Sequence, residues 1–347
     1  MSRKPDQSAL AAVMMEARHA AWPLILFSAG INVLMLTGAL YMLQVYNRVL
    51  SSHSLETLVV LTLIALTALL ALAALEAVRS RLLVVVGTWM NARLSPVLLA
   101  ASVEQAATAP GHGNVRALRD LEQVRNFCTG SSIFPILDAP WAPIFFVAIF
   151  LMHPWLGWLA LGGGVVLFSL ALLNEVVTRA PMAESGGIQA KAYTQAEATI
   201  RNAEAVQAMG MLKPLLLRWK ALQEAASDGQ AIASNRSGII AALARCLRLA
   251  LQVGVLGLGA YLVLQAEASP GVMIAASILM GRALAPVEQA IGTWKGIIGA
   301  RAAYSRLAAI ADARGEDRPV LPLPRPKGRL EAENLVLSRE GGGEPIL

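Results

Sequence analysis

Residue types that could perform chemistry are few in this sequence, and their spacing does not suit catalysis. Its four histidines have no paired spacing, which argues against a zinc site, and Cys128 and Cys246 are too far apart to indicate a disulfide scaffold. A phosphate-binding Walker A loop ends in Gly-Lys, and no Gly-Lys dipeptide occurs anywhere in the 347 residues. The glycine run at 162–164 lies inside an apolar stretch and is not a phosphate loop. We therefore expect no catalytic, cofactor-binding or metal site in this chain.

Polar residues within or beside long apolar runs are the more informative candidates. Asp138 precedes an apolar run, where it can cap a helix at the membrane surface or mark a proline-induced bend. Arg282 and Glu288 interrupt another run, and at six residues apart they point about 240° from each other on a helix, so they cannot pair locally. Charges inside a membrane usually face a water-filled interior, unless the span is shifted and both residues lie at its cytoplasmic end.

The composition explains why these runs indicate a membrane. Hydrophobic residues make up 56% and charged residues 15%, against about 45–50% and about 25% in soluble domains, and the mean hydropathy is +0.56. A span needs about 20 mostly apolar residues. We expect an all-α membrane protein with six transmembrane helices, whose spans are 22–43, 57–75, two within 139–174 that meet at His153-Pro154, 249–266 and 271–291.

Basic residues set the expected orientation. Arginine and lysine concentrate in the long intervals 79–133 and 175–248, whereas the three short connections contain one basic residue, Arg48. Basic residues mark the cytoplasmic side, so both termini and both long intervals are expected there, and the net charge of +6 reflects the membrane rather than a nucleic acid. The long intervals are helix-forming and predict long cytoplasmic extensions of the spans, broken at 110–114 and 209–214.

The expected domain organisation has four parts. Residues 1–20 form an N-terminal cytoplasmic segment, residues 21–312 the transmembrane domain, residues 313–328 a proline-rich linker, and residues 329–347 the first strand of a truncated nucleotide-binding domain.

Several segments carry a specific resemblance to a known family. They are 43–50 (LQVYNRVL), 138–143 (DAPWAP), 203–211 (AEAVQAMGM) and 281–289 (GRALAPVEQ). With them, the chain resembles the transmembrane domain of type I secretion ABC transporters, of the permease/ATPase type that exports proteases and lipases. Position 47 departs from the pattern of that family, which more often has Asp where this chain has Asn.

The resemblance implies a homodimer that secretes unfolded proteins with a C-terminal signal, including RTX-type proteases and lipases, in one step. The implied partners are an ABC ATPase domain that uses ATP and Mg, a periplasmic membrane fusion protein, a TolC-like outer-membrane channel and the lipid bilayer of the bacterial inner membrane, with no nucleic acid. Without a Walker A loop, this chain alone is expected to have no ATPase activity. The residues expected to couple it to the ATPase domain are Asn114, Arg119, Asp120, Met209, Gly210 and Met211, and those expected along the translocation path are Asp138, Trp141, Arg282 and Glu288.

Two other functions share this topology. One is the transmembrane half of a drug or lipid exporter, which is expected to lack the motifs above. The other is a non-transporting membrane scaffold, for example a truncated product that only dimerises.

Overall fold

The computed structural model describes residues 9–108 and 116–313, and all of its regular elements in these ranges are helices. The expectation of an all-α fold is therefore confirmed for this part of the chain. The linker and the strand expected after residue 313 lie outside the described residues, as does the break at 110–114. In chain order the elements are α1 (Ala9–Leu34), α2 (Thr37–Gln44), η1 (Val45–Val49), α3 (Leu50–Ser52), α4 (Leu55–Thr108), α5 (Arg116–Thr129), η2 (Ser131–Ile133), α6 (Phe134–Asp138), η3 (Ala139–Trp141), α7 (Ala142–Met152), α8 (Pro154–Arg201), α9 (Ala203–Ala208), α10 (Leu212–Leu264) and α11 (Pro270–Ala313).

Six stretches of the described residues are long and apolar enough to cross a membrane, which confirms the expected number of spans. They are Trp22–Ser52, Leu55–Val103, Ser131–Met152, Pro154–Arg201, Leu212–Leu264 and Pro270–Ala309. The long apolar run at 139–174 divides as expected, because α7 ends at Met152 and α8 begins at Pro154. The His153 side chain accepts a hydrogen bond from the Trp155 backbone at this turn and caps the start of α8.

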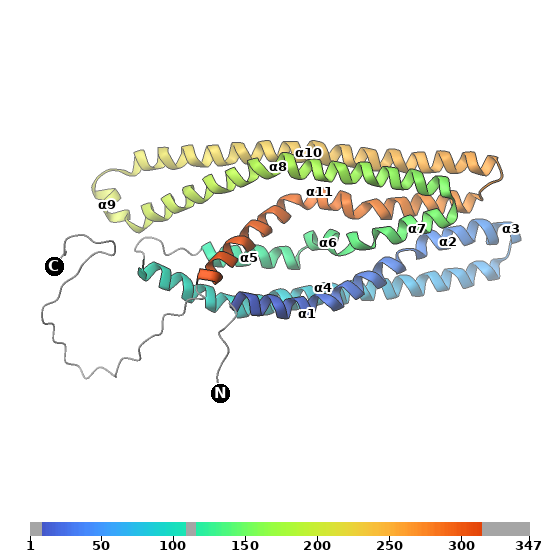
Figure 1. Cartoon of the computed structure of the whole chain (residues 1–347), viewed down its shortest axis with the longest axis horizontal. Coiled ribbons are helices and arrows are strands. Elements are labelled where there is room, and N and C mark those ends of the chain that lie inside the picture. The colour runs from blue at the N-terminus through green and yellow to red at the C-terminus, as the bar shows by residue number, and fades with distance from the viewer. Residues whose placement is uncertain (1–8, 109–115, 314–347) are drawn as a thin grey trace, which may run out of the picture. The chain divides into compact units, whose positions relative to one another are not determined.

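Three helices are much longer than a bilayer is thick. With 54, 48 and 53 residues, α4, α8 and α10 extend for about 70–80 Å at about 1.5 Å per residue, whereas the hydrocarbon core is about 30 Å thick. Figure 1 shows α8 and α10 side by side as an antiparallel pair joined through α9. The spans therefore continue as helices well beyond the membrane, as the composition of the long intervals predicted.

The first span differs from the single helix that its sequence suggested. It divides at Met35 and Leu36 into α1 and α2, and the Leu36 backbone N–H donates to the Val33 carbonyl three residues back. The span then continues through the π-helical segment η1. Such local changes of helical pitch occur often at functional sites.

Two apolar cores hold the described helices together. The larger contains residues of α2, α7, α8, α10 and α11, with Phe145, Leu167, Leu279 and Leu284 fully buried. The smaller lies where α4, α5 and α11 meet outside the membrane-spanning core, around Leu98, Leu121 and Leu307. Because α11 contributes to both cores, it connects the membrane region to the helices that extend beyond it.

Candidate functional site

Asp138 belongs to a buried polar cluster formed by three elements. Its carboxylate Oδ1 lies 2.8 Å from Nη1 of Arg79 on α4 and accepts a hydrogen bond from Nδ2 of Asn32 on α1 at 3.2 Å. Arg79 also donates to Oγ of Ser28 at 3.1 Å, and its guanidinium stacks 4.6 Å from the ring centre of Phe134. Asp138 makes no side-chain capping hydrogen bond, so its interpretation as a helix cap is wrong. The cluster instead fastens α1, α4 and α6 to one another.

Trp141 follows one turn after this cluster, at the end of η3. Its indole Nε1–H is buried without a hydrogen-bond partner among the described residues. No contact of this indole tests its assignment to the translocation path, which stays a prediction.

Glu288 and Arg282 have different environments, although both interrupt the sixth span. Glu288 pairs with Arg248 of α10, and its other oxygen lies 3.5 Å from Nε of Arg245. Arg282 is exposed and makes no ion pair or hydrogen bond among the described residues. Glu288 therefore joins α11 to α10, and Arg282 alone of the two keeps its charge free.

The first of the two segments expected to couple to an ATPase domain contains a second buried ion pair. Asp120 on α5 is 5% exposed, and its two carboxylate oxygens accept from Nε and Nη2 of Arg306 on α11 at 2.8 and 2.6 Å. Such bidentate pairs are among the stronger and more directional polar contacts in proteins. Arg119 stacks on Tyr193 of α8 at 5.6 Å, and Asn114 lies outside the described residues. Asp120 thus fixes α5 to α11.

The second coupling segment is an exposed turn between the two long helices of the α8–α10 pair. The backbone N–H of Gly210 donates to Gln207 and that of Met211 donates to Val206, a pattern that closes the end of α9. Gly210 adopts the left-handed conformation, with φ of +64°, that this closure requires. Met209 is 70% exposed and Met211 is also exposed. The turn therefore presents two flexible apolar side chains at its surface.

Asn47 has a role that the sequence did not reveal. Its Oδ1 accepts from the backbone N–H of Gly271, at the first turn of α11, at 3.2 Å. A Cβ at Gly271 would lie only 2.5 Å from that oxygen, so the contact requires glycine. Asn47 thereby caps α11 from a segment 224 residues earlier in the chain. No local pattern could have indicated this pairing.

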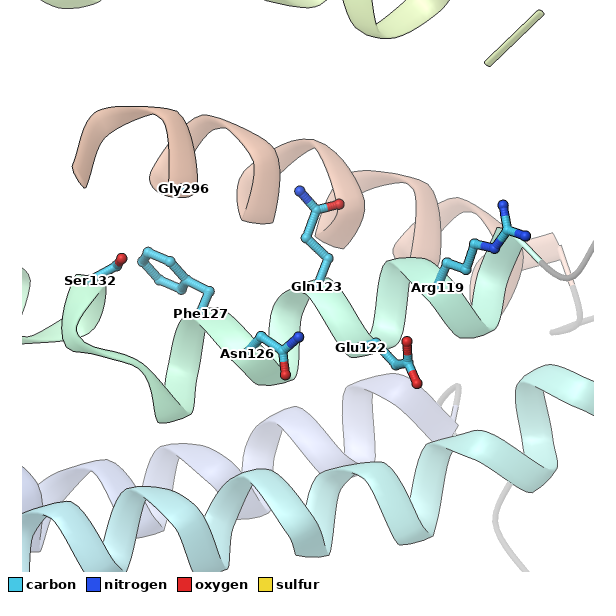
Figure 2. A pocket seen from close by; sticks show the side chains of 7 residues that line it. All are labelled: Arg119, Glu122, Gln123, Asn126, Phe127, Ser132 and Gly296. Atoms are coloured by element: carbon cyan, nitrogen blue, oxygen red, sulfur yellow. The ribbon is translucent and has the colours of Figure 1, made fainter. Parts of the chain in front are cut away.

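A polar pocket lies between α5 and α11. It has a volume of about 400 Å³ and is lined by Arg119, Glu122, Gln123, Asn126, Phe127, Ser132 and Gly296. Figure 2 shows the side chains of Gln123 and Phe127 rising from α5 toward the α11 ribbon that carries Gly296. Gly299, one turn further on, brings α11 so close to Gln123 that a Cβ would lie 2.4 Å from its amide nitrogen. Sequence analysis did not identify this pocket, because its two walls are far apart in the chain.

Six spanning helices with long helical extensions define a class of membrane transporter. The chain belongs to the ABC transporter transmembrane region family, which matches residues 22–286. More particularly, the chain is similar to several ATP-binding proteins of type I secretion and toxin translocation systems.

Three of the individual proteins similar to the chain are, by name, ATP-binding proteins of secretion or translocation systems. The chain is 39% identical over 330 residues to the type I secretion system ATP-binding protein PrsD of Rhizobium meliloti, an alignment that covers 94% of this chain and 56% of PrsD. It is 24% identical to the Toxin RTX-I translocation ATP-binding protein of Actinobacillus pleuropneumoniae (71% of this chain, 35% of that protein). It is also 24% identical to the alpha-hemolysin translocation ATP-binding protein HlyB of Escherichia coli O157:H7 (74% and 37%). The chain spans about half the length of PrsD and about a third of the other two.

Proposed function

We propose that this chain is the membrane-spanning half of a homodimeric exporter that secretes unfolded proteins in one step through a type I secretion system. Its substrates carry a C-terminal signal and include RTX-type proteases and lipases. ATP hydrolysis with Mg in a partner ATPase domain supplies the energy, and a periplasmic membrane fusion protein and a TolC-like outer-membrane channel complete the route. The observation that carries this proposal is the similarity to PrsD across 94% of the chain.

We place the protein in the bacterial inner membrane with both termini in the cytoplasm. The basic residues of the two long intervals support this orientation. In a variant without Cys128 and Cys246, a cysteine at His53 or Gln265 should react with an impermeant thiol reagent from the periplasm, because these residues lie in the turns after α3 and α10. A cysteine at Ala205 in α9 should not react, and periplasmic labelling there would reverse the orientation.

Communication with the ATPase domain is assigned to the two cytoplasmic segments, with Met209, Gly210 and Met211 as the principal contact. Exposed methionines suit this role because their flexible thioethers fill irregular grooves. Asn114 and Arg119 belong to the first segment, in which the Asp120–Arg306 ion pair connects α5 to α11. A push on α5 is thereby transmitted to the sixth span.

A substitution at Gly210 tests this coupling in the complete transporter. The left-handed conformation costs an ordinary residue about 1–2 kcal/mol, and a β-branched residue is still less suited to it, so Gly210→Val should reshape the turn. We expect normal membrane insertion and ATP hydrolysis but a steep loss of secretion. The matched control is Gly186→Val, at an exposed helical glycine of α8 with open space around its Cβ. Equal secretion by both variants would contradict the coupling role.

The substrate class is tested by transport with the same preparation. Cells that contain the complete system should release a protein with a C-terminal signal into the medium, and removal of that signal should abolish release. Efflux of amphipathic dyes without protein release would instead identify a drug or lipid exporter.

A further inference from the structure

We propose that one face of α11 lines a water-filled path in which the Arg282 guanidinium binds carboxylate groups of the polypeptide in transit. This face consists of Arg282, Ala285, Gln289, Gly292 and Gly296, and we call it the α11 polar face. The inference rests on the proposed export function and adds to it the chemistry by which the path recognises its cargo.

Arg282 lies deeper in the membrane than the ion pair at Glu288. Glu288 lies about 27 Å along α11 from Pro270, close to the full hydrocarbon thickness of about 30 Å. Its partner Arg248 lies a similar distance, about 24 Å, from the end of α10 at Leu264. These paired charges therefore mark the cytoplasmic edge of the membrane. Arg282 is only about 18 Å from Pro270 and thus lies inside the hydrocarbon layer.

Arg282 differs from three other arginines of the chain in its ion pairing. Arg79, Arg248 and Arg306 each contact a carboxylate in the described part of the chain. Arg282 is exposed and has no such partner there. A charged group at this depth is costly in lipid and normally faces water or a counter-charge, so the side of α11 that carries it does not face lipid tails.

The neighbours of Arg282 on the same side of α11 are small or polar residues. The residues of the α11 polar face follow one another at intervals of three and four, so they share one side of the helix, and they are small or polar. The opposite side carries the buried Met280, Leu284 and Ile291. By contrast, the exposed side of α10 at the same depth is apolar and includes Val253, which is 68% exposed.

The α11 polar face extends to the pocket between α5 and α11. Gly296, its last residue, also lines the polar pocket between α5 and α11, opposite Gln123 and Phe127 (Figure 2). The pocket has a volume of about 400 Å³ and is open to its surroundings. A surface of small and polar residues therefore continues from this pocket up to Arg282, without crossing the buried apolar side of α11.

Carboxylates are the ligand that suits Arg282. A guanidinium presents five N–H donors in a planar fork and no acceptor, a geometry that matches two carboxylate oxygens. No acidic residue lies on the α11 polar face itself, since Glu288 is turned toward α10. A single hydrated arginine holds each acidic side chain weakly, so the cargo can move on.

Cysteine accessibility tests the proposal with the chain itself. The background variant carries Cys128→Ser and Cys246→Ser, and the reporter is Ala285→Cys, one turn from Arg282. The matched control is Val253→Cys on the exposed apolar side of α10. In inside-out vesicles, Ala285→Cys should react with anionic and cationic methanethiosulfonates, and Val253→Cys with neither. The anionic reagent should react several-fold faster than the cationic reagent, and adding Arg282→Gln should slow the anionic reagent by about fivefold, as expected for one charge about 4 Å away in water.

Each alternative result overturns the proposal. An Ala285→Cys that is as inert as Val253→Cys means that the face contacts lipid. A spontaneous disulfide between two copies means that a second copy covers it. A reagent ratio that Arg282→Gln leaves unchanged means that the guanidinium does not act on the path.

Secretion by the complete transporter tests the ligand chemistry separately. Arg282→Gln should reduce release of an acidic substrate several-fold more than release of the same substrate with Asn and Gln in place of Asp and Glu, whereas Arg282→Lys should retain most activity. Equal effects on both substrates overturn the carboxylate assignment. If the unmodified transporter releases no protein at all, the proposed export function fails, while the labelling result still decides whether the face is hydrated.

Discussion

Removal of one partner of the Arg79–Asp138 ion pair should strongly destabilise the first three spans. Arg79 is 5% exposed, and its charge is balanced by the Asp138 carboxylate 2.8 Å away. Asp138→Ala leaves that guanidinium buried, with Ser28 Oγ as its remaining hydrogen-bond acceptor. Removing one partner of a buried pair costs about 3–5 kcal/mol. For a chain of this size, about 2 °C per kcal/mol gives a fall in Tm of about 6–10 °C.

Three further variants separate the charge from the packing. Asp138→Asn retains an oxygen that can accept from Arg79 and Asn32, so it should lose about 1–2 kcal/mol, because neutral hydrogen bonds are weaker than charge-assisted ones. The double variant Arg79→Met/Asp138→Leu removes both charges at similar volume and should recover most of the stability. Glu224→Ala is the control, because Glu224 pairs with Lys220 on the exposed surface of α10 at 3.6 Å, where such pairs contribute at most about 0.5 kcal/mol.

Unfolding of the detergent-purified protein, followed by circular dichroism at several heating rates, measures these differences. If Asp138→Ala shifts the Tm no more than Glu224→Ala, Arg79 is not in a low-dielectric site and the reasoning is wrong. If the double variant is as unstable as Asp138→Ala, the loss comes from packing rather than from an uncompensated charge. A secretion defect in Asp138→Ala without any loss of stability would instead support the translocation-path role.

Three other outcomes are expected. Asn47→Asp should raise stability by about 0.3–1 kcal/mol in thermal unfolding, because a carboxylate at the N-terminus of α11 interacts favourably with the helix dipole; an unchanged or lower Tm would contradict this. Gly271→Ala should lower the Tm, since the new Cβ would come within 2.8 Å of the Leu43 carbonyl oxygen, and a neutral effect would show that the end of α2 moves away easily. Burial raises the pKa of the Cys128 thiol, so less of it is thiolate at a given pH, and its alkylation should need a higher pH than that of the exposed Cys246; equal rates across pH 7–10 would refute the burial.

The long helices were predictable because their signal is local. Charge-free runs, the proline after His153 and the glycine at position 210 each specify the structure of their own segment, and the helix boundaries lie close to these positions. The division of the first span at Met35 and Leu36 was not predictable, because its apolar sequence has no proline there and reads as a continuous helix.

The roles of the polar residues were harder to predict because their partners are distant in the chain. Asp138 and Glu288 could be recognised as unusual, but not that Arg79 and Arg248 neutralise them. A sequence pattern indicates where a charge is located along a helix and gives no information about what lies opposite. For this reason the four residues expected along the translocation path fall into different environments, and Arg282 alone is an exposed, unpaired charge.

The contacts of α11 suggest how its motion is constrained. Asn47 holds its first turn, Arg248 holds Glu288 near the middle, and Asp120 holds Arg306 near its end. These three contacts join α11 to three different parts of the fold: η1, α10 and α5. A rotation of α11 about its own axis would break all three contacts. A movement of α11 together with α5 would preserve the Asp120–Arg306 contact but would strain the Glu288–Arg248 contact. The point at which α11 meets α10 is therefore where a displacement of α5 must be either resisted or released.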